Sequence, residues 1–158
     1  MASPRSGSLE VFRIADRRHQ IFDGEGAARH GARWNSPGRR IIYAAETYAG
    51  AMLEILVRAN IGRPPRTHSW IKIVIGKNVG IEELDARDVL GWDSVDLRAS
   101  RAFGDRWYDE ARTAVLIVPS IVARPERNIA INQNHPDFSK IRATTPKPVI
   151  WDQRLFGR

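Results

Sequence analysis

A single carboxylate interrupts an apolar helical stretch near the end of the first third of the chain. The stretch reads MLEILV over residues 52–57, and Glu54 is its one charged residue. A carboxylate on a largely buried helix needs a partner, because burying an unpaired charge is unfavourable by several kcal/mol. Glu54 either forms an ion pair with Arg58 one turn later or faces a polar site. We favour a site, since a polar loop rich in arginine and glycine precedes the helix.

Arg33 is the second candidate, in the segment GARWN at residues 31–35. Its planar guanidinium suits paired phosphate oxygens, and Gly31 permits close backbone approach, so a pyrophosphate is a natural ligand. The alternative is a surface arginine stacked on Trp34. Tyr43 follows in a β-branched run, where it either packs in the core or stacks on a planar ligand. The glycines of GEGAARHG do not form a dinucleotide-binding fingerprint, because no strand precedes them and their spacing differs.

Three polar residues follow later strands. Ser120 comes directly after AVLIVP, at a strand end where side chains commonly line sites. Without a nucleophile elbow, hydrogen bonding is its expected role. Asn132 and His135 lie in INQNHPDF. They could cap or brace a turn, and for His135 we favour this role over catalysis.

The composition indicates one ordinary domain. The chain has 158 residues, of which 42% are hydrophobic, enough for a real core. We expect a single domain over residues 1–158, with residues 1–8 as a flexible arm. No apolar run approaches the roughly 18 to 20 residues that cross a bilayer, and no signal peptide is evident, so we expect a cytoplasmic protein without membrane contact. Zero cysteines and four scattered histidines argue against a metal site.

The net charge of +7 favours attraction to polyanions and raises nucleic acid or an acidic partner as possibilities. The charge is uneven, however, because residues 82–110 are rich in aspartate and glutamate. Most arginines sit singly between apolar or glycine residues, unlike the blocks of a nucleic-acid tail. A solvated surface with an arginine bias therefore competes strongly with a nucleic-acid face.

Hydrophobic periodicity predicts several strands with a few helices dispersed between them. The expected strands cover residues 9–14, 40–45, 70–75, 114–118, 128–132 and 148–151. The expected helices run from the cap Thr47 to Arg58, over residues 101–112 and for one turn in 135–141. The first helix should bury a stripe of Ala49, Met52, Leu53, Leu56 and Val57. Residues 16–40 should form an irregular loop, 61–67 a turn, and 78–92 a short strand and a helical turn around Leu84. This order predicts an α+β fold with a strongly bent or split sheet.

Three ordered segments, residues 24–57, 104–120 and 124–138, resemble the RES domain, the toxin half of RES–Xre toxin–antitoxin modules. The family is named after an Arg, a Glu and a Ser, which match Arg33, Glu54 and Ser120. The resemblance covers nearly the whole chain from residue 12 to 141. It implies a fold similar to ADP-ribosyltransferase toxins, with a split, partly perpendicular β-sheet core around an NAD⁺ cleft.

The resemblance also implies roles for five residues in cleaving the nicotinamide–ribose bond of NAD⁺, which passes through an oxocarbenium-like state. Glu54 would supply an anion near the anomeric carbon and orient the acceptor. Arg33 would hold the diphosphate, and Tyr43 would stack against the nicotinamide or its ribose. Ser120 and Asn132 would hydrogen-bond ribose or phosphate. NAD⁺ is then a substrate, and the chemistry requires no strong general acid.

Two positions depart from the family's pattern, and several alternatives remain open. Gln133 replaces a usual proline and Ala32 a usual glycine.

The ADP-ribose acceptor is a protein side chain, water or phosphate. The implied partner is an Xre-type helix-turn-helix antitoxin that covers or plugs the cleft, with the segments around Trp92 and Trp107 as candidate apolar contacts. The rivals are a basic nucleic-acid-binding or ribonuclease toxin, and a domain that only binds its antitoxin.

Overall fold

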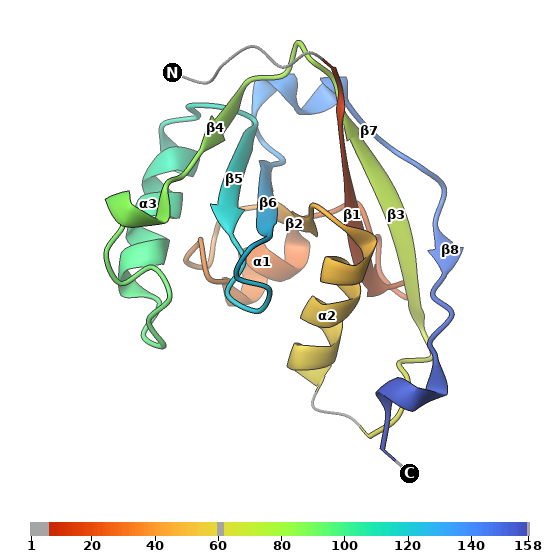
Figure 1. Ribbon diagram of the computed structural model, residues 1–158. Coiled ribbons are helices and arrows are strands. Elements are labelled where there is room, and N and C mark those ends of the chain that lie inside the picture. The colour runs from red at the N-terminus through yellow and green to blue at the C-terminus, as the bar shows by residue number, and fades with distance from the viewer. Residues whose placement is uncertain (1–6, 60–61, 158) are drawn as a thin grey trace.

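A computed structural model describes residues 7–59 and 62–157, and its central feature is one mixed sheet (Figure 1). The strands are β1 Leu9–Asp16, β2 Ile41–Ala45, β3 His68–Ile75, β4 Ile81–Glu83, β5 Val115–Pro119, β6 Arg127–Asn132, β7 Ile141–Ala143 and β8 Lys147–Pro148. In this described part of the chain, their order is β4-β5-β6-β2-β1-β3-β7, with β8 also pairing with β3. Strands β4 and β5 are parallel, and the other pairs are antiparallel.

The sheet is split between β1 and β2. These strands are joined through one residue pair, Phe12 with Ala45. By contrast, β1 pairs with β3 along its whole length, and β2 pairs with β6 from Ile41 to Ala45. Two well-paired halves therefore meet at a narrow junction, which confirms the expected split sheet and leaves room for a cleft beside it.

Three α-helices cover different parts of this sheet. They are α1 Glu25–His30, α2 Tyr48–Ala59 and α3 Arg98–Asp109, accompanied by 3₁₀ turns at Ala86–Asp88, Pro136–Lys140 and Gln153–Leu155. Helix α2 packs on β1 and β2 through Tyr48, Ala51 and Ile55. Helix α3 packs Trp107, which is fully buried, against Leu116 and other residues of β5 and β6. Figure 1 shows α2 near the split and α3 beside β4 and β5.

The predicted strands of the central sheet are confirmed, as are the short strand and helical turn expected within residues 78–92. The expected strand at 148–151 is wrong, because the last strand is β8 and ends at Pro148. Trp151 instead packs edge-on against Phe156, with ring centroids 6.0 Å apart. Of the expected flexible arm, residues 1–6 lie outside the described residues, and so does residue 61 of the expected turn.

The loop expected over residues 16–40 is wrong in part, because it contains α1. The sequence did not indicate this helix, because the glycine before it, Gly24, is typical of an irregular segment. Gly24 instead serves close packing, since a Cβ there would lie 2.7 Å from the backbone nitrogen of Ile41. Its own N–H donates to Gln133 Oε1 at 2.7 Å, so the start of α1 depends on a residue far away in sequence.

The buried stripe expected for α2 is wrong in part, although Met52 packs on the core as expected. Leu53 and Val57 are 38% and 58% exposed, whereas Tyr48 and Ile55 face the sheet. Tyr48 sets this rotation by packing edge-on against Phe12 of β1. The expected cap is confirmed, because Thr47 Oγ1 accepts the Gly50 N–H at 2.8 Å.

Helix α3 begins three residues before its expected start. Asp96 Oδ1 accepts the Arg98 N–H at 2.9 Å and so satisfies a free donor of the first turn.

Among the described residues, no helix combines the length and the apolar character needed to cross a bilayer.

Candidate active site

A cavity of about 670 Å³ lies at the split of the sheet. Strands β1 and β2 form its floor, with Arg13 and Tyr43 among the lining residues. Helix α2 contributes Glu54 to the lining, and the loop after α1 contributes Arg33. Three residues expected to carry chemistry therefore share one cavity.

Glu54 faces this cavity from α2. Its Oε1 accepts a hydrogen bond from Asn128 Nδ2 at 2.9 Å, and Ser120 Oγ lies 3.5 Å from the same oxygen. No donor from residues 7–59 or 62–157 is recorded at its Oε2, and Arg58 forms no ion pair with it. The expected alternative, an ion pair along the helix, is therefore not the arrangement found. One oxygen is oriented by the protein, which leaves the other for a ligand.

Ser120 supports this carboxylate from behind. Its side chain is 3% exposed, and its Oγ accepts the Ala123 N–H at 3.0 Å. At 3.5 Å the contact with Glu54 is at the outer limit for a hydrogen bond. A buried hydroxyl with these neighbours suits the expected hydrogen-bonding role better than that of a nucleophile.

Arg33 is held by the loop that precedes α3. Its Nη1 donates to the carbonyl oxygens of Trp92 and Ser94, both at 3.1 Å. Its own carbonyl oxygen accepts from Ser100 Oγ at 2.6 Å. The remaining guanidinium donors are left for an anion, because one nitrogen satisfies both carbonyls. The side chain is thus fixed in place, unlike a free surface arginine.

Tyr43 of β2 lines the same cavity and packs against a core cluster that includes Trp34 and Ile41. Its hydroxyl donates to Asn35 Oδ1 at 2.6 Å. Burial raises the pKa of the Tyr43 hydroxyl well above its ordinary value, so the phenol stays neutral. The residue thus lines the cavity with its hydroxyl bonded to the protein.

Asn132 does not line the cavity. It is 2% exposed, and its Oδ1 accepts the Asn134 N–H at 2.9 Å. Asn128, four residues earlier on β6, lines the cavity and bonds Glu54. Because four residues of a strand span about 13 Å, the two amides lie on one face but far apart. His135 braces the next turn as expected, with Nδ1 accepting from the Asp137 N–H at 3.0 Å.

Comparison with known proteins bears directly on this cavity. Residues 10–152 match the RES domain. The chain belongs to the RES domain family. It is 36% identical over 145 residues to the Prs ADP-ribosylating toxin of Sphingobium sp. (strain YBL2), covering 87% of this chain and 88% of the relative. It is 34% identical to a protein named Toxin Res from Pseudomonas putida, covering 85% and 92% of the two chains.

A solved structure agrees with this assignment at the level of the fold. The M. tuberculosis MbcT–MbcA toxin–antitoxin complex matches with a TM-score of 0.73 and 17% identity, covering 90% of this chain and 87% of that one. The expectations of a RES toxin with the α+β fold of that family are confirmed. ADP-ribosylation consumes NAD⁺, so the expectation of an NAD⁺-using enzyme is supported at the level of the family.

The sequence did not single out Arg13 and Asn128, which are among the polar residues that line this cavity. Arg13 of β1 donates from Nε to the Ile21 carbonyl at 2.7 Å and from Nη1 to the Tyr43 carbonyl at 2.8 Å, and so bridges the split. Burial, together with the charge of Arg58, lowers the pKa of Arg13 to about 10. The signal was available, because Arg13 is the one charge in the strand segment VFRIA. Asn128 gave no such signal, since its partner Glu54 is distant in sequence.

The tryptophans expected near an antitoxin contact are core residues. Trp92 is 8% exposed and Trp107 is fully buried. Trp92 stacks on Trp34 with ring centroids 6.2 Å apart, and this stack supports the loop that carries Arg33. The contribution of both rings to the fold is therefore packing. In the segment around Trp92, however, Leu90 and Val95 are exposed, so an antitoxin contact there stays a prediction.

Proposed function

We propose that this chain is the toxin of a toxin–antitoxin system and cleaves NAD⁺ at the bond between nicotinamide and ribose. One observation carries the proposal. Glu54 lies on the wall of a cavity with one oxygen held by Asn128 and the other available to a ligand. A fixed anion in such a position stabilises the positive charge that develops on the ribose.

Cations on the other walls would hold the diphosphate. Arg33, Arg58 and Arg101 line the cavity together with Arg13. Arg13 uses two nitrogens, Nε and Nη1, to bind carbonyls, whereas Arg33 uses Nη1 alone, so Arg33 and Arg58 have more donors left for phosphate oxygens. Planar guanidinium groups bind paired phosphate oxygens well, and no metal is needed for that contact.

The chemical step uses few protein groups. The bond between the nicotinamide nitrogen and the ribose carbon breaks, and its electron pair neutralises the departing ring. A lone pair of the acceptor then forms the new bond to that carbon, while the proton of the acceptor passes to Glu54 or solvent. The ring of Tyr43 would stack against nicotinamide or its ribose. Ser120 would act by supporting Glu54.

The acceptor belongs to one of two classes, and one experiment separates them. The purified chain is incubated with NAD⁺ labelled on the adenylate, with and without cell lysate, and then with purified Prs, the protein for which one relative is named. Label on a discrete protein establishes ADP-ribosyl transfer. Label confined to small products establishes water or phosphate as acceptor. Intact NAD⁺ in every sample overturns the proposed function.

An Xre-type helix-turn-helix antitoxin is the proposed partner of this single-domain toxin. The support is the toxin–antitoxin complex that matches the fold. We place both proteins in the cytoplasm, where NAD⁺ is available. Co-expression with the antitoxin encoded beside the toxin should restore growth and reduce NAD⁺ consumption.

The distribution of surface charge favours an NAD⁺-cleaving toxin over a nucleic-acid-binding protein. Arginines across the surface are paired with acids, as in Arg39 with Asp109 at 2.7 Å and Arg112 with Glu82 at 2.5 Å. Such pairing divides the positive surface that a phosphate backbone would need. Binding to a nucleic acid with a steep dependence on salt would favour the rival instead.

A further inference from the structure

Asn35 is a fully buried amide at the meeting point of three elements of the cavity. Its side chain is 0% exposed. Its Nδ2 donates to the Ala27 carbonyl of α1 and to the Ser36 carbonyl, both at 3.0 Å, and its Oδ1 accepts from the Tyr43 hydroxyl of β2 at 2.6 Å. One side chain therefore links α1, the following loop and β2.

The backbone of Asn35 also closes the turn that presents Arg33. Its carbonyl oxygen accepts the Ala32 N–H at 2.9 Å, and its N–H donates to the Ala32 carbonyl at 3.4 Å. Arg33 and Trp34 are the two residues between these contacts. The position of Asn35 thus sets the position of the turn, and the turn sets the backbone from which Arg33 reaches the cavity.

The hydroxyl of Tyr43 is occupied by this arrangement. It donates to Asn35 Oδ1 at 2.6 Å. The one O–H of the phenol is therefore committed to the protein and is not left to donate to a substrate. Substrate contact by Tyr43 is then restricted to its ring, whose angle depends on Asn35.

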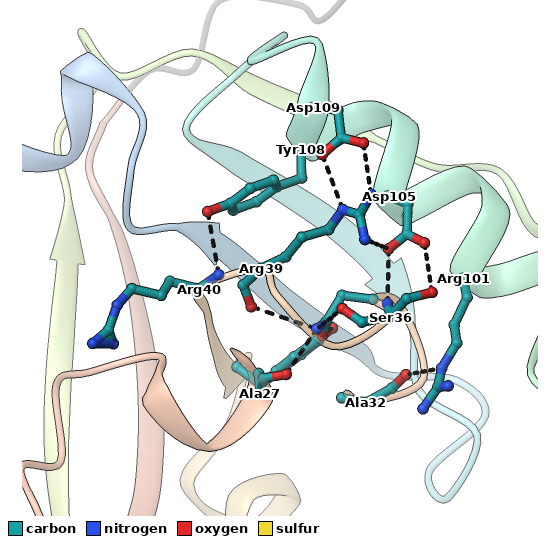
Figure 2. Close-up of polar contacts among 11 residues, drawn as sticks. Ala27, Ala32, Ser36, Arg39, Arg40, Arg101, Asp105, Tyr108 and Asp109 are labelled. Carbon is teal, nitrogen blue, oxygen red and sulfur yellow. Dashed lines mark hydrogen bonds and ion pairs between the residues drawn. The ribbon is translucent and has the colours of Figure 1, made fainter. Parts of the chain in front are cut away.

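We propose that Asn35 is a positioning residue that holds the Tyr43 ring and the Arg33 turn in register for NAD⁺. The inference rests on the proposed function. A buried amide suits this task because its carbonyl oxygen and its NH₂ group bind partners of opposite kind on its two sides. Figure 2 shows the surrounding contacts, in which Ser36 is held in turn by Asp105.

Asn35→Asp tests only the hydrogen bonds that the NH₂ group of Asn35 donates. It keeps the size of the side chain and an acceptor for Tyr43, but it places a carboxylate oxygen against the carbonyls of Ala27 and Ser36. We expect KM for NAD⁺ to rise at least about tenfold with a smaller change in kcat, because Arg33 grips the bound substrate. Thr113→Val is the control, since it removes the partner of the buried Trp107 Nε1 outside the cavity. A loss in Asn35→Asp no greater than the loss in Thr113→Val overturns the proposal.

Variants of Tyr43 test the hydrogen bond that Asn35 Oδ1 accepts, and they do so even if Asn35→Asp does not fold. Tyr43→Phe removes the hydroxyl that donates to Asn35 Oδ1 and keeps the ring, so KM for NAD⁺ should rise in the same direction as in Asn35→Asp, whereas Tyr43→Ala should lose most activity. An unchanged KM in Tyr43→Phe would overturn the proposal. Equal inactivity of both variants would mean that the hydroxyl acts on substrate and would overturn the proposal. A wild-type chain that leaves NAD⁺ intact contradicts the proposed function itself, which separates the two failures.

Discussion

The two sides of the cavity are built differently. On one side, Glu54 stands on the regular helix α2 and is oriented by Asn128 of the regular strand β6. On the other side, Arg33 stands on an irregular turn that is held by α1, by α3 and by the segment before α3. The carboxylate is positioned by secondary structure, whereas the arginine is positioned by individual long-range contacts.

Helix α3 supplies much of the support on the arginine side. Asp105 accepts from the backbone N–H and the hydroxyl of Ser36 at 2.8 and 2.6 Å, and Arg101 Nε donates to the Ala32 carbonyl at 2.9 Å. Figure 2 shows these contacts beside the pair of Arg39 with Asp109 and Asp105. The difference suggests that damage to the carboxylate side reduces chemistry, while damage to the arginine side loosens binding.

Glu54→Gln should have the largest effect. It keeps the shape of the side chain and an acceptor for Asn128, but it removes the anion that faces the developing charge. We expect kcat for NAD⁺ consumption to fall at least about 100-fold with little change in KM, as for loss of a charge-stabilising group elsewhere. Growth inhibition should be lost as well.

The control for this variant is Glu10→Gln, whose carboxylate pairs with Lys72 outside the cavity and should leave the reaction unchanged. A Glu54→Gln chain that still consumes NAD⁺ and arrests growth would show that the carboxylate of Glu54 has no essential role in the reaction.

Gly104→Ala should have an intermediate effect, on the arginine side. A Cβ at Gly104 would lie 1.7 Å from the Trp34 carbonyl oxygen, so α3 and the Arg33 turn must move apart. We expect the free energy of unfolding to fall by about 1 to 3 kcal/mol, as for other overpacked sites. KM for NAD⁺ should rise by roughly tenfold with a smaller change in kcat, by the same reasoning from binding kinetics.

Gly26→Ala is the matched control for stability, because no atom lies within 4 Å of a Cβ at this position in α1. Alanine is favoured over glycine in a helix by about 1 kcal/mol, so the control should unfold at the same temperature or higher. A Gly104→Ala chain that gains stability would show that α3 does not constrain the turn.

The contrast between the two sides also explains which parts of the fold the sequence predicts. Alternation and β-branched runs located the central strands, because buried strands need a continuous apolar face. The rotation of α2 was predicted wrongly, since Leu53 and Val57 look like core residues until Tyr48 is seen to pack on Phe12. Helix α1 was missed because its start depends on Gln133, which is distant in sequence.

For the candidate site, the resemblance named Arg33, Tyr43, Glu54, Ser120 and Asn132. The structure places the first three on one cavity and Ser120 beside Glu54, whereas Asn132 lies away from the cavity. Asn128 was not among the predicted site residues, because its distance from Glu54 depends on how α2 packs against the sheet. The residues that hold Arg33 gave no local signal either. Their carbonyls and hydroxyls become partners only after the chain has folded.

Asp109→Asn should have the smallest effect and depends on pH. Arg39 donates to both oxygens of Asp109 at 2.9 and 2.7 Å, and this pairing holds the pKa of Asp109 below its ordinary value. A carboxyl whose pKa is lowered by folding stabilises the protein above its unfolded pKa of about 3.9 and loses that contribution as the pH falls through the lower folded value. The pair is half exposed, so the loss in Asp109→Asn at pH 7 should stay below about 1 kcal/mol. Denaturant titrations of both chains at pH 7 and then below pH 4 should show this difference shrinking. A difference that persists in acid would mean that Asp109 supports α3 through packing and not through its charge.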